Sequence, residues 1–482
     1  MIDVYIISTY RPRFCGIAEF SANVVASLRG YRRSNKDVGD VQVAAIGSGE
    51  NGVKYNTSDV FTSIRQFDQK SWEEAGESIS QRVKDGRSLG KQGIVLANLE
   101  YGIIGEYDAK QDNLTPLLRV LKDNSVPVIL QLHTLPNPEH PDFSYQLEVL
   151  KSTARYSNTI AVISKIAGDK LSQPPYSLEA NVVQIDHGVR AHRYRRDDRE
   201  LAKAKYGLDN LIVVTTLGFN SPNKGREFSA QAHSEFLKGL SESQRRRIVY
   251  IMAGGYHPDF VKKDSGKFFR EYKEKFLGML ESSGLTVLET SRLSNVKKED
   301  FEKGDVILWD KLLSESEFKG LFTASDIIVN PTRDKWQVAS GILAEVLGYG
   351  RASISTASLY ANEIMLPDAA VYEEVIGRRH KEKWGMLSDV WDKSNGIVVP
   401  LNDSPGEMPV PDIETITRAE YYLLFGSPKT RRDMELRARK RGRRMPWSLI
   451  AGDYHLLCQD IIEGVEKSGE KILSFREPKT DS

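Results

Sequence analysis

The chain has 482 residues, with 67 Lys and Arg against 66 Asp and Glu and a formal net charge of +1. This length predicts two large domains or three small ones, and the balanced charge excludes a global electrostatic field for holding nucleic acid or an acidic membrane. The two cysteines, Cys15 and Cys458, are too few for a disulfide framework or a structural zinc site, which favours a reducing compartment.

The N-terminus begins directly with a strand-like run, MIDVYIISTY, without a basic leader or a small-residue cleavage site. No apolar stretch approaches the roughly 18 residues that would cross a bilayer. We therefore expect a soluble, cytoplasmic protein.

Short apolar runs alternate with longer helix-like segments in two series. The first series covers residues 4–8, 41–47, 93–99, 126–132, 159–164 and 181–185, and the second, after a charged stretch at 190–208, covers 211–218, 247–254, 285–290, 305–309, 326–331, 351–356 and 396–400. Because the runs are continuously apolar, they predict parallel strands buried on both faces by helices. Two such series predict two doubly wound α/β domains joined by a charged linker, with ligands at the loops that follow the strands.

The loop after the first run, STYRPRFCGIAEF, leads into an amphipathic helix that opens at Gly16. A glycine at a helix start lets backbone N–H groups approach an anion, and the helix dipole favours negative charge there. An ordinary tight turn in which Gly16 only relieves strain is an equal alternative.

The second series repeats this arrangement in LGFNSPNKGREF, where Lys224 and Gly225 follow a strand. A lysine beside such a loop suits a diphosphate, although the spacing is not that of a Walker A loop. Taken alone, Lys224 is better explained as a solvated surface lysine.

A third loop, DKWQVASGILAEVLGYG, places Gln337 before a predicted helix and Glu345 about one turn inside it. Helical side chains tilt toward the N-terminus, so Glu345 can lean back toward a ligand that Gln337 also contacts. The alternative is that Glu345 is a surface helix residue.

Together these segments resemble the retaining glycosyltransferases of the GT-B fold, the large group 1 (family 4) class, over nearly the whole chain. The matching segments are CGIAEF, GFNSPNKG, and the Gln337 and Glu345 pair in place of an E-x7-E pair. A bacterial subgroup whose N-terminus reads TYPPRxCGIATF is still more similar, through TYRPRFCGIAEF, LEYGIIGE and LHTLPNPEHPDF.

The resemblance implies two Rossmann-like domains facing a central cleft. Residues 1–190 would bind the acceptor, residues 191–445 would bind the nucleotide-diphosphate sugar, and residues 446–482 would form a helix crossing back to the first domain, plus a tail. The implied donor-binding residues are Gly16, Asn223, Lys224, Leu312, Gln337, Ser340, Gly341, Ile342 and Glu345. The implied acceptor-binding residues are Glu100, Tyr101 and His133.

By the same resemblance, Lys224 would neutralise the diphosphate, Glu345 would accept hydrogen bonds from the ribose, and Gln337 and His133 would contact the donor sugar. These four residues are the catalytic candidates. A front-face transfer with retention needs charge stabilisation on the leaving phosphates and no separate base. The nucleotide sugar is a co-substrate, and no cofactor is expected.

Two positions depart from the class pattern. Phe219 replaces the usual arginine, so phosphate affinity would rely on Lys224, Arg333, Lys335 or Arg11. Gln337 replaces the first glutamate, and an amide donates as well as accepts hydrogen bonds. These departures leave open a specialised transferase or a partner without activity.

Metal dependence is not expected. Asp197 and Asp198 lack the D-x-D pattern, and His140, His187 and His257 are scattered without ligand spacing.

The basic run at 429–444 has two explanations, contact with anionic lipid or a lipid-linked acceptor, and a solvated helix face, which is favoured.

Three functional classes remain open from the sequence. The first is a retaining hexosyltransferase that uses a UDP- or GDP-sugar and a glycan or other hydroxyl acceptor. The second is another GT-B enzyme, a sugar phosphorylase or nucleotide-sugar epimerase. The third is a non-catalytic subunit that binds nucleotide sugar or glycan.

Overall fold

The chain forms two compact units. In the computed structural model the described residues are 1–47, 55, 58–190, 192, 197–301, 303–367, 390–403, 407–464 and 473–474. Unit 1 contains Met1–Gly188, Trp336–Gly341 and Met445–Ser482, and unit 2 contains Val189–Lys335 and Ile342–Arg444. Most of the tail expected at the C-terminus, residues 465–472 and 475–482, lies outside the described residues.

Unit 1 is built on a parallel sheet with the strand order β17-β7-β6-β5-β4-β1-β2-β3. Its strands are β1 (Ile2–Ser8), β2 (Val38–Gly47), β3 (Val60–Arg65), β4 (Gln92–Leu99), β5 (Val128–Leu132), β6 (Thr159–Val162), β7 (Val182–Gln184) and β17 (Leu473–Ser474). Because all pairs are parallel, the loops that follow β1, β4 and β5 meet at one edge of the sheet.

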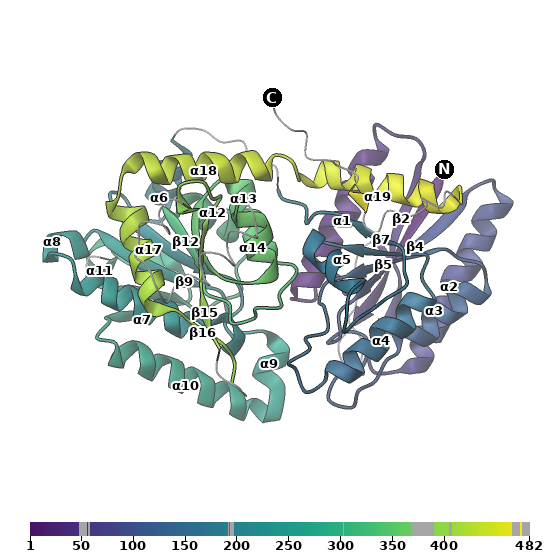
Figure 1. Cartoon of the computed structure of the whole chain (residues 1–482), viewed down its shortest axis with the longest axis horizontal. Coiled ribbons are helices and arrows are strands. Elements are labelled where there is room, and N and C mark those ends of the chain that lie inside the picture. Colours follow the sequence, from purple (N-terminus) through teal and green to yellow (C-terminus); the bar gives the residue numbers. More distant parts are fainter. Residues whose placement is uncertain are drawn as a thin grey trace. The chain divides into compact units, whose positions relative to one another are not determined.

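The helices of unit 1 cover the sheet on both faces (Figure 1). They are α1 (Gly16–Arg32), α2 (Gln69–Ser88), α3 (Leu114–Asp123), α4 (Phe143–Arg155), α5 (Lys165–Leu171) and α19 (Trp447–Ile462). Helix α1 buries Phe20, Val24 and Leu28, which recur every four residues and so lie on one side of the helix. Helix α19 packs beside α1 and places the C-terminal segment in unit 1.

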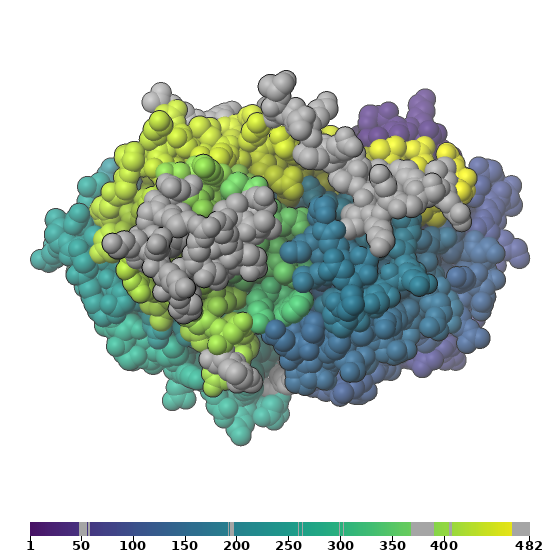
Figure 2. Space-filling view, viewed as in Figure 1, coloured from purple at the N-terminus to yellow at the C-terminus, as the bar shows by residue number. Residues whose placement is uncertain are grey.

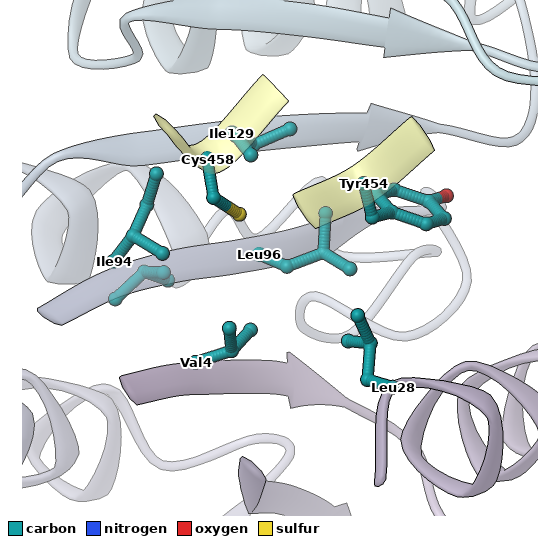
Figure 3. Close-up of a pocket in the computed structure, with 8 residues that line it drawn as sticks. Val4, Leu28, Ile94, Leu96, Ile129, Tyr454 and Cys458 are labelled. Carbon is teal, nitrogen blue, oxygen red and sulfur yellow. The ribbon is translucent and has the colours of Figure 1, made fainter. Parts of the chain in front are cut away.

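The packing of α19 on the sheet is apolar, as Figure 3 shows. The narrow space beneath the helix is lined by Val4, Leu28, Ile94, Val95, Leu96, Ile129, Tyr454 and Cys458, and it does not admit a water molecule. Burial raises the pKa of Cys458 to about 12, so this cysteine is a neutral thiol. This space is therefore part of the hydrophobic core and not a ligand site.

Unit 2 contains a second parallel sheet, with the order β10-β11-β9-β8-β12-β13-β14. Its strands are β8 (Ile212–Leu217), β9 (Ile248–Ala253), β10 (Val287–Thr290), β11 (Val306–Trp309), β12 (Ile327–Asn330), β13 (Ala352–Thr356) and β14 (Ile397–Val399). A separate antiparallel pair joins β15 (Leu401–Asn402) to β16 (Val410–Pro411).

The helices of unit 2 lie on both faces of its sheet. They are α6 (Asp198–Lys205), α7 (Arg226–Lys238), α8 (Glu242–Arg245), α9 (Pro258–Lys262), α10 (Lys267–Ser282), α11 (Lys298–Phe301), α12 (Glu315–Ala324), α13 (Gly341–Tyr349), α14 (Leu359–Met365), α17 (Ile413–Phe425) and α18 (Pro428–Gly442). Short 3-10 turns are η1 (Pro222–Lys224), η2 (Lys263–Gly266) and η3 (Leu293–Asn295). Consecutive strand residues enter opposite cores: Val214 packs with α7, α10 and α17, while Val213 packs with α12 and α13. The expectation of strands buried on both faces is confirmed.

Part of the charged stretch expected to be a linker is a docked helix. Lys203 of α6 is buried, and its ammonium lies 2.7 Å from an Asp326 carboxylate oxygen, with Arg199 at 3.5 Å from the same carboxyl group. Burial alone would raise the pKa of Asp326, but these cations outweigh burial and lower it. The charge in this stretch thus fixes α6 to the start of β12.

The basic helix α18 lies at the surface of unit 2 (Figure 2). Its apolar side is buried through Met434 and Ala438. Several polar groups on α18 contact the rest of unit 2: Glu435 pairs with Arg199, Arg431 lies 3.8 Å from Asp326, and Arg437 donates to the carbonyl of Ser394 at 2.8 Å. These groups serve folding, and lipid contact stays a prediction.

Every apolar run identified in the sequence forms a strand, and the strands missed in the described part of the chain are β3 and the two-residue strands β15, β16 and β17. Strand β3 pairs only with β2 and is largely half-buried or exposed, so its sequence, VFTSIR, lacks the continuous apolar character of a central strand. Among the described residues, no helix has the length and apolar character needed to cross a membrane.

We expect Gly188→Ala to loosen the attachment of α19. A Cβ at Gly188 would lie 2.2 Å from the Trp447 ring, and overpacking of this kind costs about 1–3 kcal/mol. Urea unfolding would measure the loss. The matched control is Gly30→Ala, an exposed position in α1 where a Cβ meets nothing within 4 Å and helix stability should rise by about 0.5–1 kcal/mol. Equal stability of the two variants would contradict this account.

Candidate functional site

The loop that follows β8 in unit 2 has a backbone that only glycine accommodates at its turns. Gly218 has φ +111° and Gly225 has φ +58°, both in the left-handed region. A Cβ at Gly225 would lie 2.2 Å from the carbonyl oxygen of Pro331, which follows β12. The loop after β8 is therefore pressed against the loop after β12, and Lys224 is held between them.

Lys224 is a half-buried cation. No carboxylate or hydrogen-bond acceptor among the described residues pairs with its ammonium, although its backbone N–H donates to the carbonyl of Ser221 at 2.9 Å. Burial lowers the pKa of Lys224; the charge of Asp334 opposes this shift and that of Arg226 adds to it. An unpaired lysine in this setting favours an incoming anion, in contrast to the solvated surface lysine considered from the sequence.

The neighbouring Asn223 supports the loop mainly through its backbone. Its carbonyl accepts hydrogen bonds from the Arg333 N–H at 2.9 Å and the Thr332 hydroxyl at 3.4 Å. Its side chain is exposed and accepts from the hydroxyl of Ser221 at 2.6 Å. The donor-binding role predicted for Asn223 stays a prediction.

The loop after β11 carries Leu312, one of the expected donor-binding residues. Leu312 is half-buried, and a Cβ at Gly255, which follows β9, would lie 3.0 Å from its backbone nitrogen. Helix α12 then begins with a capping box in which Ser314 and Glu317 satisfy each other's backbone N–H groups. Leu312 thus lies beside the loop after β9, at the same edge of the sheet as Lys224.

Glu345 is buried in α13 and is not a surface helix residue. Its Oε1 accepts a hydrogen bond from Nη1 of Arg190 at 2.7 Å, while its Oε2 is buried and has no hydrogen-bond partner among the described residues. Burial raises the pKa of Glu345 and the charge of Arg190 opposes the shift. The carboxylate has one oxygen fixed and one that can accept a hydrogen bond from a ligand.

Ile342 brings the start of α13 to the β8 loop. Its Cδ1 would lie 3.8 Å from a Cβ at Gly218. The preceding segment, Trp336–Gly341, belongs to unit 1; there Gln337 and Ser340 are half-buried and Gly341 is exposed. In unit 1 a Cβ at Gly341 would meet Nε2 of His187 at 3.5 Å.

In unit 1, His133 directly follows β5 and is buried against Phe20, with ring centroids 4.7 Å apart. Its Nε2 lies 2.6 Å from Oδ1 of Asn98, whose amide nitrogen donates to the carbonyl of Ile7. With the amide oriented this way, Nε2 carries the proton and Nδ1 is the acceptor. Burial lowers the pKa of His133 to about 3, so the ring is neutral near pH 7. His133 therefore suits a neutral hydrogen-bonding role and not proton transfer at neutral pH.

The two residues predicted in the loop after β4 differ in exposure. Glu100 is half-buried and accepts a hydrogen bond from the hydroxyl of Thr134 at 2.5 Å. Tyr101 is only 2% exposed, and its hydroxyl is enclosed without a hydrogen-bond partner among the described residues. Glu100 lies half-buried at the strand end and its acceptor-binding role stays a prediction, whereas Tyr101 lies in the core.

Gly16 begins α1, as expected, and a Cβ there would meet nothing within 4 Å. The helix is capped by Cys15, whose sulfur accepts from the N–H of Ala18 at 3.3 Å. The backbone φ of Gly16 is not in the left-handed region, so strain relief does not account for this glycine. A side chain would therefore fit at this position, and the donor-binding role of Gly16 stays a prediction.

Three cations considered as substitutes for the missing arginine have protein partners. Arg333 donates to the carbonyls of Pro409 at 2.8 Å and Met408 at 2.7 Å. Lys335 pairs with Asp403 at 2.9 Å, and Arg11 pairs with Glu19 through Nε at 2.8 Å. These contacts leave Lys224 as the one cation of the four without a pairing group in the described part of the chain.

Sequence reasoning missed three residues of these sites: Asn98, Arg190 and Arg226. Arg190 follows the apolar end of the first series, and Arg226 opens α7 directly after the Lys-Gly pair. Arg226 could have been noticed in the sequence as a charged residue at the start of a helix whose other residues are mostly buried. Asn98 was hidden inside the apolar run of β4.

No group of three or more His, Cys, Asp or Glu side chains in the described ranges is arranged to hold a metal ion. His187 instead packs by its ring against Phe20 and Trp447, with centroids 5.4 Å from each. The ring of His257 lies 5.0 Å from that of Phe219, which occupies the position of the missing arginine.

Solved structures of other proteins are similar along almost the whole chain. HepE of Anabaena, in complex with UDP and glucose, is 12% identical, with a TM-score of 0.57, and the match covers 95% of this chain and 99% of HepE. Sucrose-phosphate synthase of Thermosynechococcus elongatus is 14% identical, with a TM-score of 0.60 and coverage of 96% and 100%. A UDP-forming α,α-trehalose-phosphate synthase of Burkholderia xenovorans, in complex with glucose-6-phosphate, is 11% identical, with a TM-score of 0.57 and coverage of 95% and 100%.

No protein-family model matches the chain, and no curated protein matches it in sequence. At identities this low the structural likeness shows the fold, two α/β units with parallel sheets. The GT-B fold class expected from the sequence is confirmed.

We expect His133→Gln to make stability less sensitive to acid. The pKa of His133 falls from 6.5 to about 3 in the folded chain, so the unfolded chain takes up the proton first as pH drops. Stability is unaffected above about pH 6.5 and is lost from there down to about pH 3, by up to about 1.4 kcal/mol per pH unit. Urea unfolding at pH 7, 6, 5 and 4 should give a shallower slope for the variant, and parallel slopes would refute the assignment.

Removal of Arg190 should leave the buried carboxylate of Glu345 without its ion-pair partner. We expect Arg190→Met to destabilise unit 2 by about 3 kcal/mol, and Glu345→Gln in the same chain to recover much of that loss. A double-mutant cycle from urea unfolding measures the coupling. Arg246→Met, which breaks an exposed pair with Glu242, is the control and should change stability by less than about 0.5 kcal/mol. Strictly additive effects would show that the pair does not couple.

Proposed function

We propose that this chain is a retaining glycosyltransferase that moves a hexose from a nucleotide-diphosphate sugar to a hydroxyl of a glycan or other acceptor. The observation that carries the proposal is Lys224, a half-buried lysine without a pairing group among the described residues, held by a glycine-bounded loop at the carboxyl end of β8. Similar folds have been solved with UDP and with UDP-glucose, which favours UDP over GDP as the nucleotide.

In this proposal the leaving diphosphate develops charge as its bond to the sugar breaks. Lys224 stabilises that charge, and the N–H groups at helix starts add to it. The acceptor hydroxyl enters on the face from which the nucleotide departs, and its proton passes to the leaving phosphate. No protein base is needed, in agreement with a His133 that is neutral and weakly basic.

Glu345 would recognise the nucleoside. Its Oε2, which has no hydrogen-bond partner among the described residues, would accept a hydrogen bond from a ribose hydroxyl, while Arg190 holds Oε1 in place. The neutral His133 would accept from a sugar hydroxyl through Nδ1, with Asn98 fixing its tautomer. Gln337 would contact the donor sugar, and Glu100 the acceptor.

Incubation with UDP-, GDP- and ADP-sugars, with nucleotide release followed by chromatography, tests the proposal. We expect release with at least one donor, faster with an acceptor, and an α-linked product by proton NMR when an α-linked donor is used. Lys224→Ala should lower the rate about 100-fold or more, because one stabilising group for the leaving charge is lost. The control Lys238→Ala removes an exposed lysine at the C-terminal end of α7 that is paired with Glu235.

Donor binding by calorimetry without turnover in any acceptor mixture would instead point to the non-catalytic subunit. Formation of sugar-1-phosphate from glycan and phosphate would point to a phosphorylase. Equal rates of nucleotide release for Lys224→Ala and the unchanged chain would contradict the proposed role of Lys224.

A further inference from the structure

Arg226 is a buried cation at the first position of α7. It is 2% exposed, and its Nη2 donates to the carbonyl of Gly218 and, at 3.0 Å, to the carbonyl of Ala253. Gly218 follows β8 and Ala253 ends β9, so one guanidinium joins the carboxyl ends of two adjacent strands. This is the edge of the sheet at which Lys224 lies.

The charge of Arg226 is not neutralised by a direct partner. No carboxylate among the described residues forms an ion pair with it, and its Nε is buried without a hydrogen-bond partner. Asp310 attracts it at longer range but is itself paired with Lys273 at 3.1 Å. A buried cation held only by neutral carbonyls is costly to a fold unless an anion joins it.

The next residue, Glu227, does not remove the need for an anion. Burial raises the pKa of Glu227, and the charges of Arg333, Lys275 and Arg226 oppose this shift without reversing it. Its Oε1 lies 4.0 Å from Nη1 of Arg333, which also donates to two backbone carbonyls. Its Oε2 is buried without a hydrogen-bond partner in the described part of the chain.

The backbone around Arg226 is packed as closely as glycine allows. Gly254 has φ +126°, and a Cβ there would lie 1.8 Å from the carbonyl oxygen of Gly218 and 3.3 Å from Nη2 of Arg226. Arg226 also contributes to the lowered pKa of Lys224, which means that the two cations repel each other. Lys224 and Arg226, which repel each other, form no ion pair with a carboxylate among the described residues, and they lie beside loops in which glycines leave little side-chain bulk.

We propose that Arg226 is a positioning residue of the diphosphate site: it holds the strand-end carbonyls away from the ligand and supplies the second positive charge beside Lys224. It thereby replaces the arginine that the motif resemblance expects where Phe219 stands. The ligand class is an inorganic or nucleoside diphosphate. This inference rests on the proposed function for its biological ligand, but the anion site can be tested without a nucleotide.

Titration calorimetry of the full chain with inorganic pyrophosphate tests the proposal. Arg226→Lys keeps the charge, and Arg226→Gln keeps an N–H donor for a carbonyl but is neutral. We expect Arg226→Lys to bind pyrophosphate within about threefold of the unchanged chain and Arg226→Gln to bind at least tenfold more weakly, as one charge contact worth about 1.4 kcal/mol is lost. Phe219→Arg added to Arg226→Gln should restore part of the affinity.

Arg246→Met is the control, because it removes an exposed arginine whose partner is Glu242, and it should leave pyrophosphate affinity unchanged. If Arg226 only ties the strands together, Arg226→Lys and Arg226→Gln will lose thermal stability alike and bind pyrophosphate alike, which overturns the proposal. Absence of pyrophosphate binding by the unchanged chain also overturns it. Pyrophosphate binding without turnover of any nucleotide sugar would sink the proposed function and leave the anion site standing.

Discussion

Burial of both faces of each parallel sheet is the constraint from which the rest of this structure follows. Val213 and Val214 enter apolar cores on opposite sides of one sheet. Helices must cover both faces, so the strands run parallel and every connection crosses over the sheet. The loops after the strands then gather at one edge, which is where Lys224, Arg226 and Leu312 lie in unit 2, and His133 and Glu100 in unit 1.

The polar groups at these edges are held by contacts that leave part of each group available. Asn98 hydrogen-bonds to one nitrogen of His133, and Arg190 donates to one oxygen of Glu345. The carbonyls of Gly218 and Ala253 accept hydrogen bonds from one nitrogen of Arg226. Each contact fixes the orientation of a side chain without satisfying it completely. A buried polar group that is only partly hydrogen-bonded lowers stability, and under the proposed function a ligand would complete these hydrogen bonds.

Much of the fold was predictable because its signal is local. Continuous apolar runs identified the central strands, and the half-buried edge strand β3 and the two-residue strands β15, β16 and β17 escaped this criterion. Gly225 and Lys224 were also predictable as part of a loop at the end of a strand, whereas their binding of an anion stays a prediction. The sequence could not show which cation compensates for Phe219. Arg333, Lys335 and Arg11 all look available in the sequence, and only the structure shows that each already contacts a protein group.

The sequence by itself determined the alternation of strands and helices, the class of the fold and the loops in which chemistry is concentrated, because hydrophobic periodicity and glycine placement act over a few residues. Only the tertiary structure decided which charges are compensated. Arg190 and Glu345 are 155 residues apart, and Lys203 and Asp326 also belong to different elements of unit 2. Whether a charge is paired, buried or left for a ligand depends on atoms within a few ångströms, and chain folding, not sequence proximity, brings those atoms together.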